Sequence, residues 1–501
     1  MSRLFRKGLF RATSALILDL LLCGLCFAQA PTSPPSQPPA SPQTAEPKSG
    51  QKAADQSDEK PSDKPGTKIT PAQAEQLFKD VDTILNFASK DTALPIKHEV
   101  KRRLASRDEV VGYLKKNMAE DKDVQRLRRT ELVLKKFGLL PKDYDLQTFL
   151  VSLLEEQVAG YYDAKTKTVN LLDWVLPDLQ RPVLAHELTH ALQDQSFGLD
   201  KWLRRGAEDL DTKKDLTPED ITKDENSEAR EAVAEGQAMV VLVDYMLVPM
   251  HRTVADAPEV VDMLNEGMAS GSADSPQFKN APIFMKEELM FPYHYGVEFE
   301  AELLRAQGKE KAFAATFANP PQTSREIMEP QAYLSGEHLP PLQLPDFKHI
   351  FKNYDRFDVG AIGEFDVAVL AEQYADHETA QNIYPNWRGG YYYSARLKGN
   401  STAPLGLVFV SKWSGAKAAG QFAAVYARGV QQRYKDVEAP AGSNLPVDLK
   451  TLGSLSGDHA WKTQDGDVRI AVKDDMVLVT ESLEPEIAEK FRHAVLVART
   501  P

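Results

Sequence analysis

Two histidines and a glutamate stand at a spacing that suits metal-dependent hydrolysis. In RPVLAHELTHALQDQSFG (181–198), His186 and His190 are four residues apart, and Glu187 follows the first of them. On a helix this spacing puts the imidazoles one turn apart on one face, where two ring nitrogens can bind one Zn²⁺ at about 2.0–2.1 Å. Glu187 lies beside them, placed to accept a proton from water without binding the metal. The motif predicts a zinc site with Glu187 as general base.

The flanking residues predict the helix that carries this motif. Arg181 and Pro182 suit its start, and Gly198 suits the position just past its end. Leucines spaced by four between 184 and 192 would anchor one face in the core, so we expect the histidines to face a cleft. With 10 histidines in 501 residues, a random chain would hold roughly 0.01–0.02 such motifs. A salt-bridged histidine pair is the alternative interpretation.

A catalytic zinc ion also needs a third protein ligand. The segment DENSEAREAVAEGQAMVVLVDYML (224–247) predicts a helix, capped by Asn226 or Ser227, in which Glu235 leads into an apolar face. Burying a carboxylate there is costly unless a cation meets it. We therefore predict Glu235 as the third ligand, with Glu231 as the main alternative and Asp224 and Glu228 as further ones. Glu231 or Asp194 is expected to hold a histidine N–H.

These motifs resemble those of the gluzincin metallopeptidases, whose third ligand is a glutamate on a later helix. Glu-Gly-x-Ala at 235–238 is similar to the Glu-Gly-Phe-Ala of the aminopeptidases in that class. The chain also resembles a group of largely uncharacterised secreted bacterial HExxH proteins. The matching segments are EQVAGYYDAKTKT (156–168), HELTHALQDQSF (186–197), EAVAEGQA (231–238), FPYHYGVEF (291–299) and NPPQTSREIMEPQAY (319–333).

The resemblance implies a zinc metallopeptidase that acts on a peptide or protein substrate. In that scheme Glu187 takes a proton from the attacking water and passes it to the leaving amine. A hydrogen-bond donor should stabilise the negative oxygen that develops, and Tyr293 and His294 in FPYHYG are the candidates. The alternative is that these two residues only cap and pack a helix.

Two other functions fit the same motif. One is a secreted binding or scaffold protein with a vestigial or structural zinc site. The other is a zinc hydrolase that acts on a non-peptide amide. Zinc content and the activity of a Glu187→Gln variant would separate these hypotheses.

The elements that position these residues predict an α+β fold of two domains. Helical periodicity, beginning at the Thr70 cap, predicts a mainly helical, zincin-like domain over 69–345. The turn DAKTKT between apolar runs predicts a short β-hairpin at 161–169, before the zinc helix. Over 346–501, short apolar runs alternate with two helical stretches, which predicts a smaller α+β C-terminal domain.

The first thirty residues predict export. Basic residues precede the apolar run 15–27, and the small-residue sequence AQA follows at 28–30. This layout is typical of a signal peptide (1–30), and it predicts a secreted or periplasmic protein. Residues 31–68 are dense in Pro and Ser and predict a disordered linker. Both cysteines lie within 1–30, so we expect neither a thiolate ligand nor a thiol nucleophile.

Charge and hydropathy restrict the partners. A formal charge of −13 argues against nucleic acid, because phosphates require clustered Lys and Arg. The apolar stretch 238–250 is short and interrupted by Asp244, so we expect a buried helix and no membrane span after signal cleavage. The sequence leaves the oligomeric state open.

Overall fold

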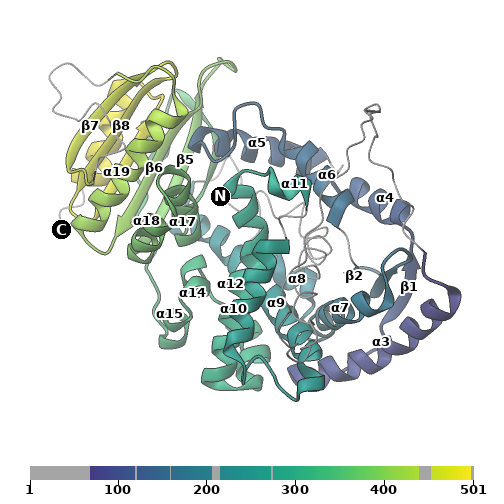
Figure 1. Ribbon diagram of the computed structural model, residues 1–501. Helices are drawn as coiled ribbons and strands as arrows, with labels where there is room; N and C mark the ends of the chain where they lie inside the picture. The colour runs from purple at the N-terminus through teal and green to yellow at the C-terminus, as the bar shows by residue number, and fades with distance from the viewer. Residues whose placement is uncertain are drawn as a thin grey trace, which may run out of the picture.

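The computed structural model describes residues 68–118, 121–157, 160–205, 215–271, 275–438 and 453–497. The predicted signal peptide and all of the predicted linker except Lys68 lie outside these residues. Helices dominate the first part of the described chain, and a six-stranded sheet lies at the other end of the molecule (Figure 1). The expected mixture of helices and strands is therefore confirmed.

A small sheet precedes the helix that carries the histidines. Strands β2 (Tyr161–Asp163) and β3 (Thr168–Leu172) pair antiparallel, which is the predicted hairpin. Strand β1 (Lys101–Ala105) pairs parallel with β3 and gives the order β1-β3-β2. We did not predict β1, because KRRLA has no apolar alternation, and its pairing with buried β3 determines its conformation. Strand β2 is left at the edge of the sheet.

Four helices accompany this sheet along the chain: one precedes β1, and three lie between β1 and β2. Helix α3 begins at the predicted Thr70 cap, where the side chains of Thr70 and Gln73 form a capping box. It packs against the helix that carries the histidines. The four are α3 (Pro71–Thr92), α4 (Arg107–Met118), α5 (Asp121–Phe137) and α6 (Leu146–Gln157).

The histidines lie on α7 (Pro177–Phe197). This helix begins four residues before the predicted start, because Pro177 takes the first-turn position that we gave to Pro182. Pro182 lies inside the helix. The predicted end is confirmed, since Gly198 adopts the left-handed conformation with φ 67° and its N–H donates to Asp194 O. Helix α8 (Leu199–Leu203) follows directly.

The central helix is α9 (Pro218–Leu247). It begins at Thr217, whose side chain forms a capping box with Asp220, so the predicted caps Asn226 and Ser227 lie inside it. Together with η2 (Val248–Met250), α9 is long and apolar enough to cross a membrane by length and composition. However, 72% of its most apolar window is buried inside the protein, which is typical of a core helix.

Helix α12 (Ile283–Gln307) packs along α9. The two backbones come closest at Gly236 and Gly296, where a Cβ on either residue would overlap the other helix. The remaining helices of this part are α10 (Pro258–Gly271), α11 (Pro276–Lys279), η4 (Lys311–Ala315), α13 (Thr316–Ala318), α14 (Ser324–Met328), α15 (Pro330–Ser335) and α16 (Phe347–Ile350).

The C-terminal part is an antiparallel sheet with helices. The strands have the order β4-β5-β6-β9-β8-β7, and α19 packs on β6, β8 and β9. The two predicted helical stretches are α17 and α19. The strands are β4 (Tyr354–Ala361), β5 (Trp387–Leu397), β6 (Gly406–Trp413), β7 (Gly457–Thr463), β8 (Gly466–Lys473) and β9 (Met476–Glu481), and the helices are α17 (Glu364–Tyr374), α18 (His377–Ile383), η5 (Tyr384–Asn386), α19 (Ala416–Arg433), α20 (Pro485–Arg492) and η7 (His493–Val497).

Both parts contribute to one continuous hydrophobic core. Buried residues from Leu77 in α3 to Val479 in β9 belong to a single cluster, and a second cluster around Phe347 and Phe491 covers the other side of the sheet. The boundary that we predict near residue 346 stays a prediction. The buried contacts across it indicate that the two parts support each other.

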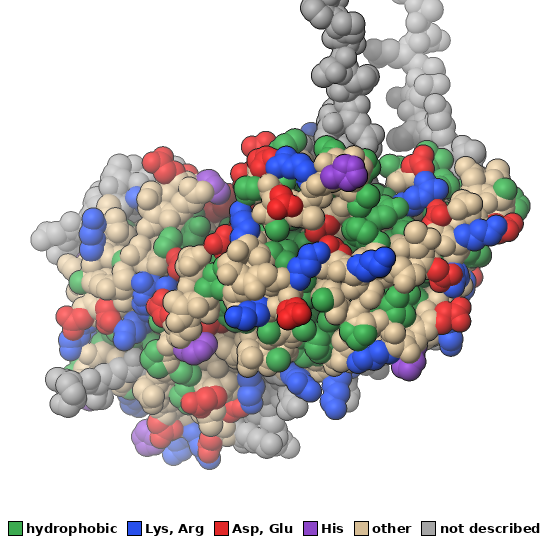
Figure 2. Space-filling model, turned by 90° about the horizontal axis from the view of Figure 1, so that it is seen from below, with side chains coloured by type: hydrophobic (Ala, Val, Ile, Leu, Met, Phe, Trp, Pro, Cys, Tyr) green, Lys and Arg blue, Asp and Glu red, His purple; other side chains and the backbone are tan. Residues whose placement is uncertain are grey.

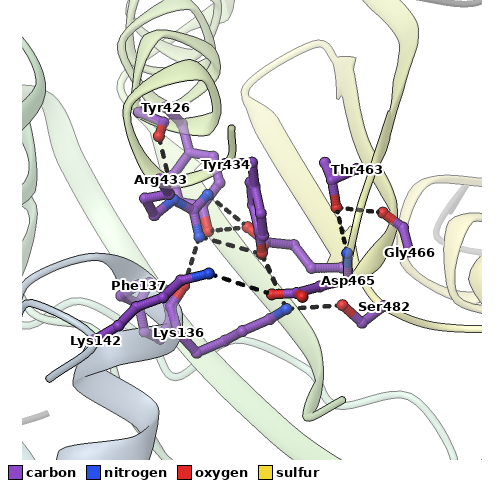
Figure 3. A network of polar contacts seen from close by, with 12 residues as sticks. Lys136, Phe137, Lys142, Tyr426, Arg433, Tyr434, Thr463, Asp465, Gly466 and Ser482 are labelled. Carbon is purple, nitrogen blue, oxygen red and sulfur yellow. Dashed lines mark hydrogen bonds and ion pairs between the residues drawn. The ribbon is translucent and has the colours of Figure 1, made fainter. Parts of the chain in front are cut away.

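A buried ionic network also joins the two parts (Figure 3). Arg433 of α19 donates to both carboxylate oxygens of Glu481 at 2.7 and 3.1 Å, and the hydroxyls of Tyr426 and Tyr434 donate to them at 2.7 and 2.8 Å. Lys136, on α5, places Nζ 3.5 Å from Glu481 Oε2. The fully buried carboxylate therefore has partners from both parts of the chain.

The surface carries charges of both signs. On the face shown in Figure 2, Lys and Arg side chains are interspersed with Asp and Glu, and apolar side chains lie between them. Over that face neither sign forms a continuous area of the kind that binds a polyanion.

Candidate metal centre

Helices α7 and α9 bring the three predicted ligands together. Nε2 of His186 lies 3.1 Å from Glu235 Oε2 and 3.1 Å from Nε2 of His190. Nε2 of His190 lies 3.3 Å from the same Glu235 oxygen. The four-residue spacing on α7 sets the two rings edge to face, with 4.7 Å between centroids, and the packing of α9 against α7 supplies the carboxylate from 45 residues further along the chain.

The donor atoms fit around one metal ion. A tetrahedral ion bound at about 2.0–2.1 Å has donor atoms about 3.3 Å apart, which matches the three separations here. Among the described residues, His186, His190 and Glu235 form the one group of three or more His, Cys, Asp or Glu whose ligand atoms converge in this way. The structure thus holds a buried His-His-Glu group that could bind a metal ion.

Burial and charge give these groups unlike pKa values. Burial lowers the pKa of His186 below its ordinary value. Burial also acts to lower the pKa of His190, but the Glu235 carboxylate outweighs it and raises that pKa to about 9. For Glu235, burial is outweighed by His190 and by hydrogen bonds from both histidines, which hold its pKa well below the ordinary value. The carboxylate therefore stays ionised, as a metal ligand must.

Glu187 lies beside the ligands and is held by the edge strand. Its Oε2 accepts a hydrogen bond of 2.7 Å from the backbone N–H of Tyr162 in β2. Its Oε1 is buried and has no hydrogen-bond partner among the described residues. Burial raises the pKa of Glu187 to about 8, and the negative charge of Glu235 adds to this effect against the attraction of His190. One oxygen is fixed, and the other is free to exchange a proton.

Tyr293 lies at this centre and His294 does not. The Tyr293 ring, on α12, is buried and nearly parallel to the His186 ring, with 6.4 Å between centroids. The next residue turns to another face of α12. His294 Nε2 lies 3.4 Å from Glu298, and its ring lines a separate cavity of about 470 Å³ with Tyr295. Of the two proposed donors, the structure brings only Tyr293 to the ligands.

Gln193 contacts a ligand where we expected an acid. Its Oε1 lies 2.9 Å from His190 Nδ1. Asp194, one of the two expected partners, instead accepts hydrogen bonds from the Tyr162 hydroxyl at 2.8 Å and from Lys167 Nζ at 2.5 Å. The signal for Gln193 was its position three residues after His190, on the same face of the helix.

Comparisons with known proteins identify no relative of this chain. No family model, no curated protein and no solved structure matches this chain. The side chains of the centre are therefore the basis for a function.

The centre is closed to solvent. The exposed fractions are 0% for His186, 1% for Glu187, 2% for His190 and 1% for Glu235. Every residue of α7 from Val183 to Asp194 is buried, so within the described part of the chain the histidines do not face the open cleft that we expected. Two cavities among the described residues, of about 640 and 470 Å³, are lined by other side chains. Access to these four side chains from solvent therefore requires the surrounding elements to move.

Proposed function

We propose that the chain is an exported zinc-dependent metallopeptidase that hydrolyses peptide bonds in peptide or protein substrates. The observation that carries the proposal is the convergence of three donor atoms from His186, His190 and Glu235 next to Glu187, whose second oxygen is free. Export rests on the predicted signal peptide. The resemblance to gluzincin peptidases, read from the motifs, supports the same reaction.

Zinc is the metal that we propose for this donor set. Two imidazoles and one carboxylate are a ligand set that catalytic zinc sites use, with a fourth position left for water. Held by the Nε2 atoms of both histidines and by Glu235, zinc would act as a Lewis acid that makes water a nucleophile near neutral pH.

Glu187 is the general base in this proposal. The Tyr162 N–H holds Oε2, which fixes the carboxylate plane and leaves Oε1 to take a proton from the attacking water. The same oxygen then gives the proton to the leaving amine. We propose Tyr293 in preference to His294 as the donor to the developing negative oxygen, because Tyr293 lies beside the His186 ring.

A second candidate function is a binding or scaffold protein with a structural metal. The burial of all four side chains favours it, because structural sites are closed whereas catalytic sites keep an open position. In that case the metal would stabilise the packing of α7 on α9, and Glu187 would serve only as a hydrogen-bond acceptor.

Zinc analysis combined with one substitution separates the two functions. The wild type, Glu187→Gln and the control Glu75→Gln, whose side chain is 70% exposed on α3, are purified with zinc. Metal content and cleavage of a mixed peptide library are then measured. A peptidase retains one zinc in all three proteins and loses turnover only in Glu187→Gln. Zinc in every protein with no cleavage by the wild type would favour the scaffold, and absence of zinc would refute both.

A further inference from the structure

A chain of two buried amides leads away from the His190 ligand. Gln193 of α7 and Gln237 of α9 are both fully buried. Gln193 Oε1 lies 2.9 Å from His190 Nδ1, and its Nε2 lies 3.0 Å from Ala234 O and 3.2 Å from Gln237 Oε1. Gln237 Nε2 continues the chain to the backbone oxygens of residues 312 and 313, at 3.1 and 3.2 Å.

The backbone carbonyls set the direction of every bond in this chain. A carbonyl oxygen only accepts, so the Gln237 atom that faces residues 312 and 313 is its NH₂, and its amide oxygen faces Gln193. In the same way the NH₂ of Gln193 faces Ala234 O, and its oxygen faces His190. Since an amide oxygen cannot donate, the hydrogen in the last bond belongs to Nδ1 of His190. The unprotonated nitrogen of a neutral His190 is then Nε2, which points at His186 and Glu235.

We infer that Gln193, oriented by Gln237, is a positioning residue that holds His190 in the tautomer and ring orientation required for binding metal through Nε2. This inference rests on the proposed metal site. It assigns to a neutral amide the role that a carboxylate or a backbone carbonyl commonly has at metal-bound histidines. A neutral partner adds no negative charge, so Glu235 remains the one anion among the three ligands.

The two histidines differ in the hydrogen bonding of their Nδ1 atoms. Nδ1 of His186 is buried and has no hydrogen-bond partner among the described residues, whereas Nδ1 of His190 has the amide chain. His190 is therefore the ligand whose orientation is fixed before the metal arrives. Removal of the amide would leave both rings without a fixed tautomer, and such changes lower metal affinity by roughly 10- to 100-fold.

The experiment compares four variants by zinc affinity, using competition with a chromophoric chelator. Gln193→Leu removes the acceptor, Gln193→Glu restores it, and Gln237→Leu removes the residue that orients it. The control is Gln195→Leu on the same helix. The Gln195 amide oxygen accepts from the backbone N–H groups of Lys97 and His98 and takes no part in the hydrogen bonds of Gln193 and Gln237. The visible spectrum of the Co²⁺-loaded protein reports the ligand geometry, and circular dichroism reports folding.

We expect a roughly 10- to 100-fold loss of zinc affinity in Gln193→Leu, a smaller loss in Gln237→Leu, and a changed Co²⁺ spectrum in both. Gln193→Glu should recover most of the affinity, and Gln195→Leu should leave it unchanged. If the wild type binds zinc and cleaves peptides but Gln193→Leu has wild-type affinity and spectrum, the positioning role is wrong and the proposed function stands. Equal losses of zinc affinity in Gln193→Leu and Gln195→Leu would also overturn the positioning role. If the wild type binds no zinc, the positioning role and the proposed function are both wrong.

Discussion

Gly236 and Gly296 lie face to face where α9 crosses α12, so close that a Cβ on Gly236 would overlap the carbonyl group of Gly296. Gly236 directly follows the proposed ligand Glu235, and Gly296 lies three residues after Tyr293. Because neither glycine has a side chain, the helix backbones touch, and the position of α9 relative to α7 and α12 depends on this contact.

A methyl group at this crossing should therefore disturb the centre. We expect Gly236→Ala to cost about 1–3 kcal/mol of unfolding free energy, since the helices must separate. Zinc affinity should fall with it, because Glu235 moves with α9. The control is Gly112→Ala in α4, where a Cβ would meet nothing within 4 Å. Urea unfolding and zinc titration measure both effects, and an undisturbed affinity in Gly236→Ala would mean that Glu235 is not a ligand.

The Tyr293 hydroxyl offers a second prediction. If it stabilises the developing negative oxygen, Tyr293→Phe should lower kcat by roughly 10²–10³ and leave zinc content unchanged. Tyr295→Phe is the matched control, because Tyr295 lies two residues further along α12 and lines the separate cavity of about 470 Å³. Steady-state kinetics on one cleaved peptide compares the two. An equal kcat for Tyr293→Phe and the wild type would assign Tyr293 to packing.

Closure of the centre predicts unusual kinetics of metal removal. Since His186, His190 and Glu235 are at most 2% exposed, a chelator reaches the metal only when the protein opens. We expect the rate of zinc loss to rise with chelator concentration and then reach a plateau that equals the opening rate. Stopped-flow mixing of zinc-loaded protein with excess chelator tests this. A rate that stays proportional to chelator concentration would indicate an open site.

The buried carboxylate of Glu481 predicts how stability depends on pH. Burial alone would raise its pKa from the ordinary 4.5, but the charges of Arg433 and Lys136 outweigh burial and hold the pKa at about 2. A pKa that is lower in the folded than in the unfolded state stabilises the fold above about pH 4.5. That contribution is lost progressively as the pH falls from about 4.5 towards 2.

Removing this charge leaves two cations buried without their partner. We expect Glu481→Gln to cost about 3–5 kcal/mol at pH 7, and much less near pH 2, where the wild-type carboxylate is itself half protonated. The control is Glu489→Gln, whose side chain is 58% exposed. Urea unfolding from pH 7 downwards measures the difference. A gap between the two variants that does not narrow at low pH would contradict the account.

The candidate metal centre was largely predictable, because each of its three residues had a local signal. The four-residue spacing of His186 and His190 needs only a helix, and Glu235 was marked by its place in front of a long apolar run. The convergence itself depends on how α9 packs on α7, which no local pattern encodes. We did not predict the contact between Gln193 and His190, because an amide carries no charge and we expected an acid beside the histidine N–H.

The fold was predictable where sequence signals were local. The Thr70 cap, the hairpin turn before Thr168 and the glycine at 198 each determine conformation within a few residues, and the structure has them as expected. Strand β1 was missed because its partner β3 lies more than 60 residues away. We predicted a cleft in front of the histidines, but the described residues bury them, because periodicity gives the face of a helix and not what covers that face.

The most direct test of the central claim is anomalous diffraction at the zinc absorption edge from crystals grown with zinc. The account predicts one strong peak at bonding distance, about 2.0–2.2 Å, from Nε2 of His186, Nε2 of His190 and a Glu235 oxygen, with Glu187 outside the ligand set. A peak at other residues, or a centre without metal in which the three side chains only hydrogen-bond to one another, would contradict it.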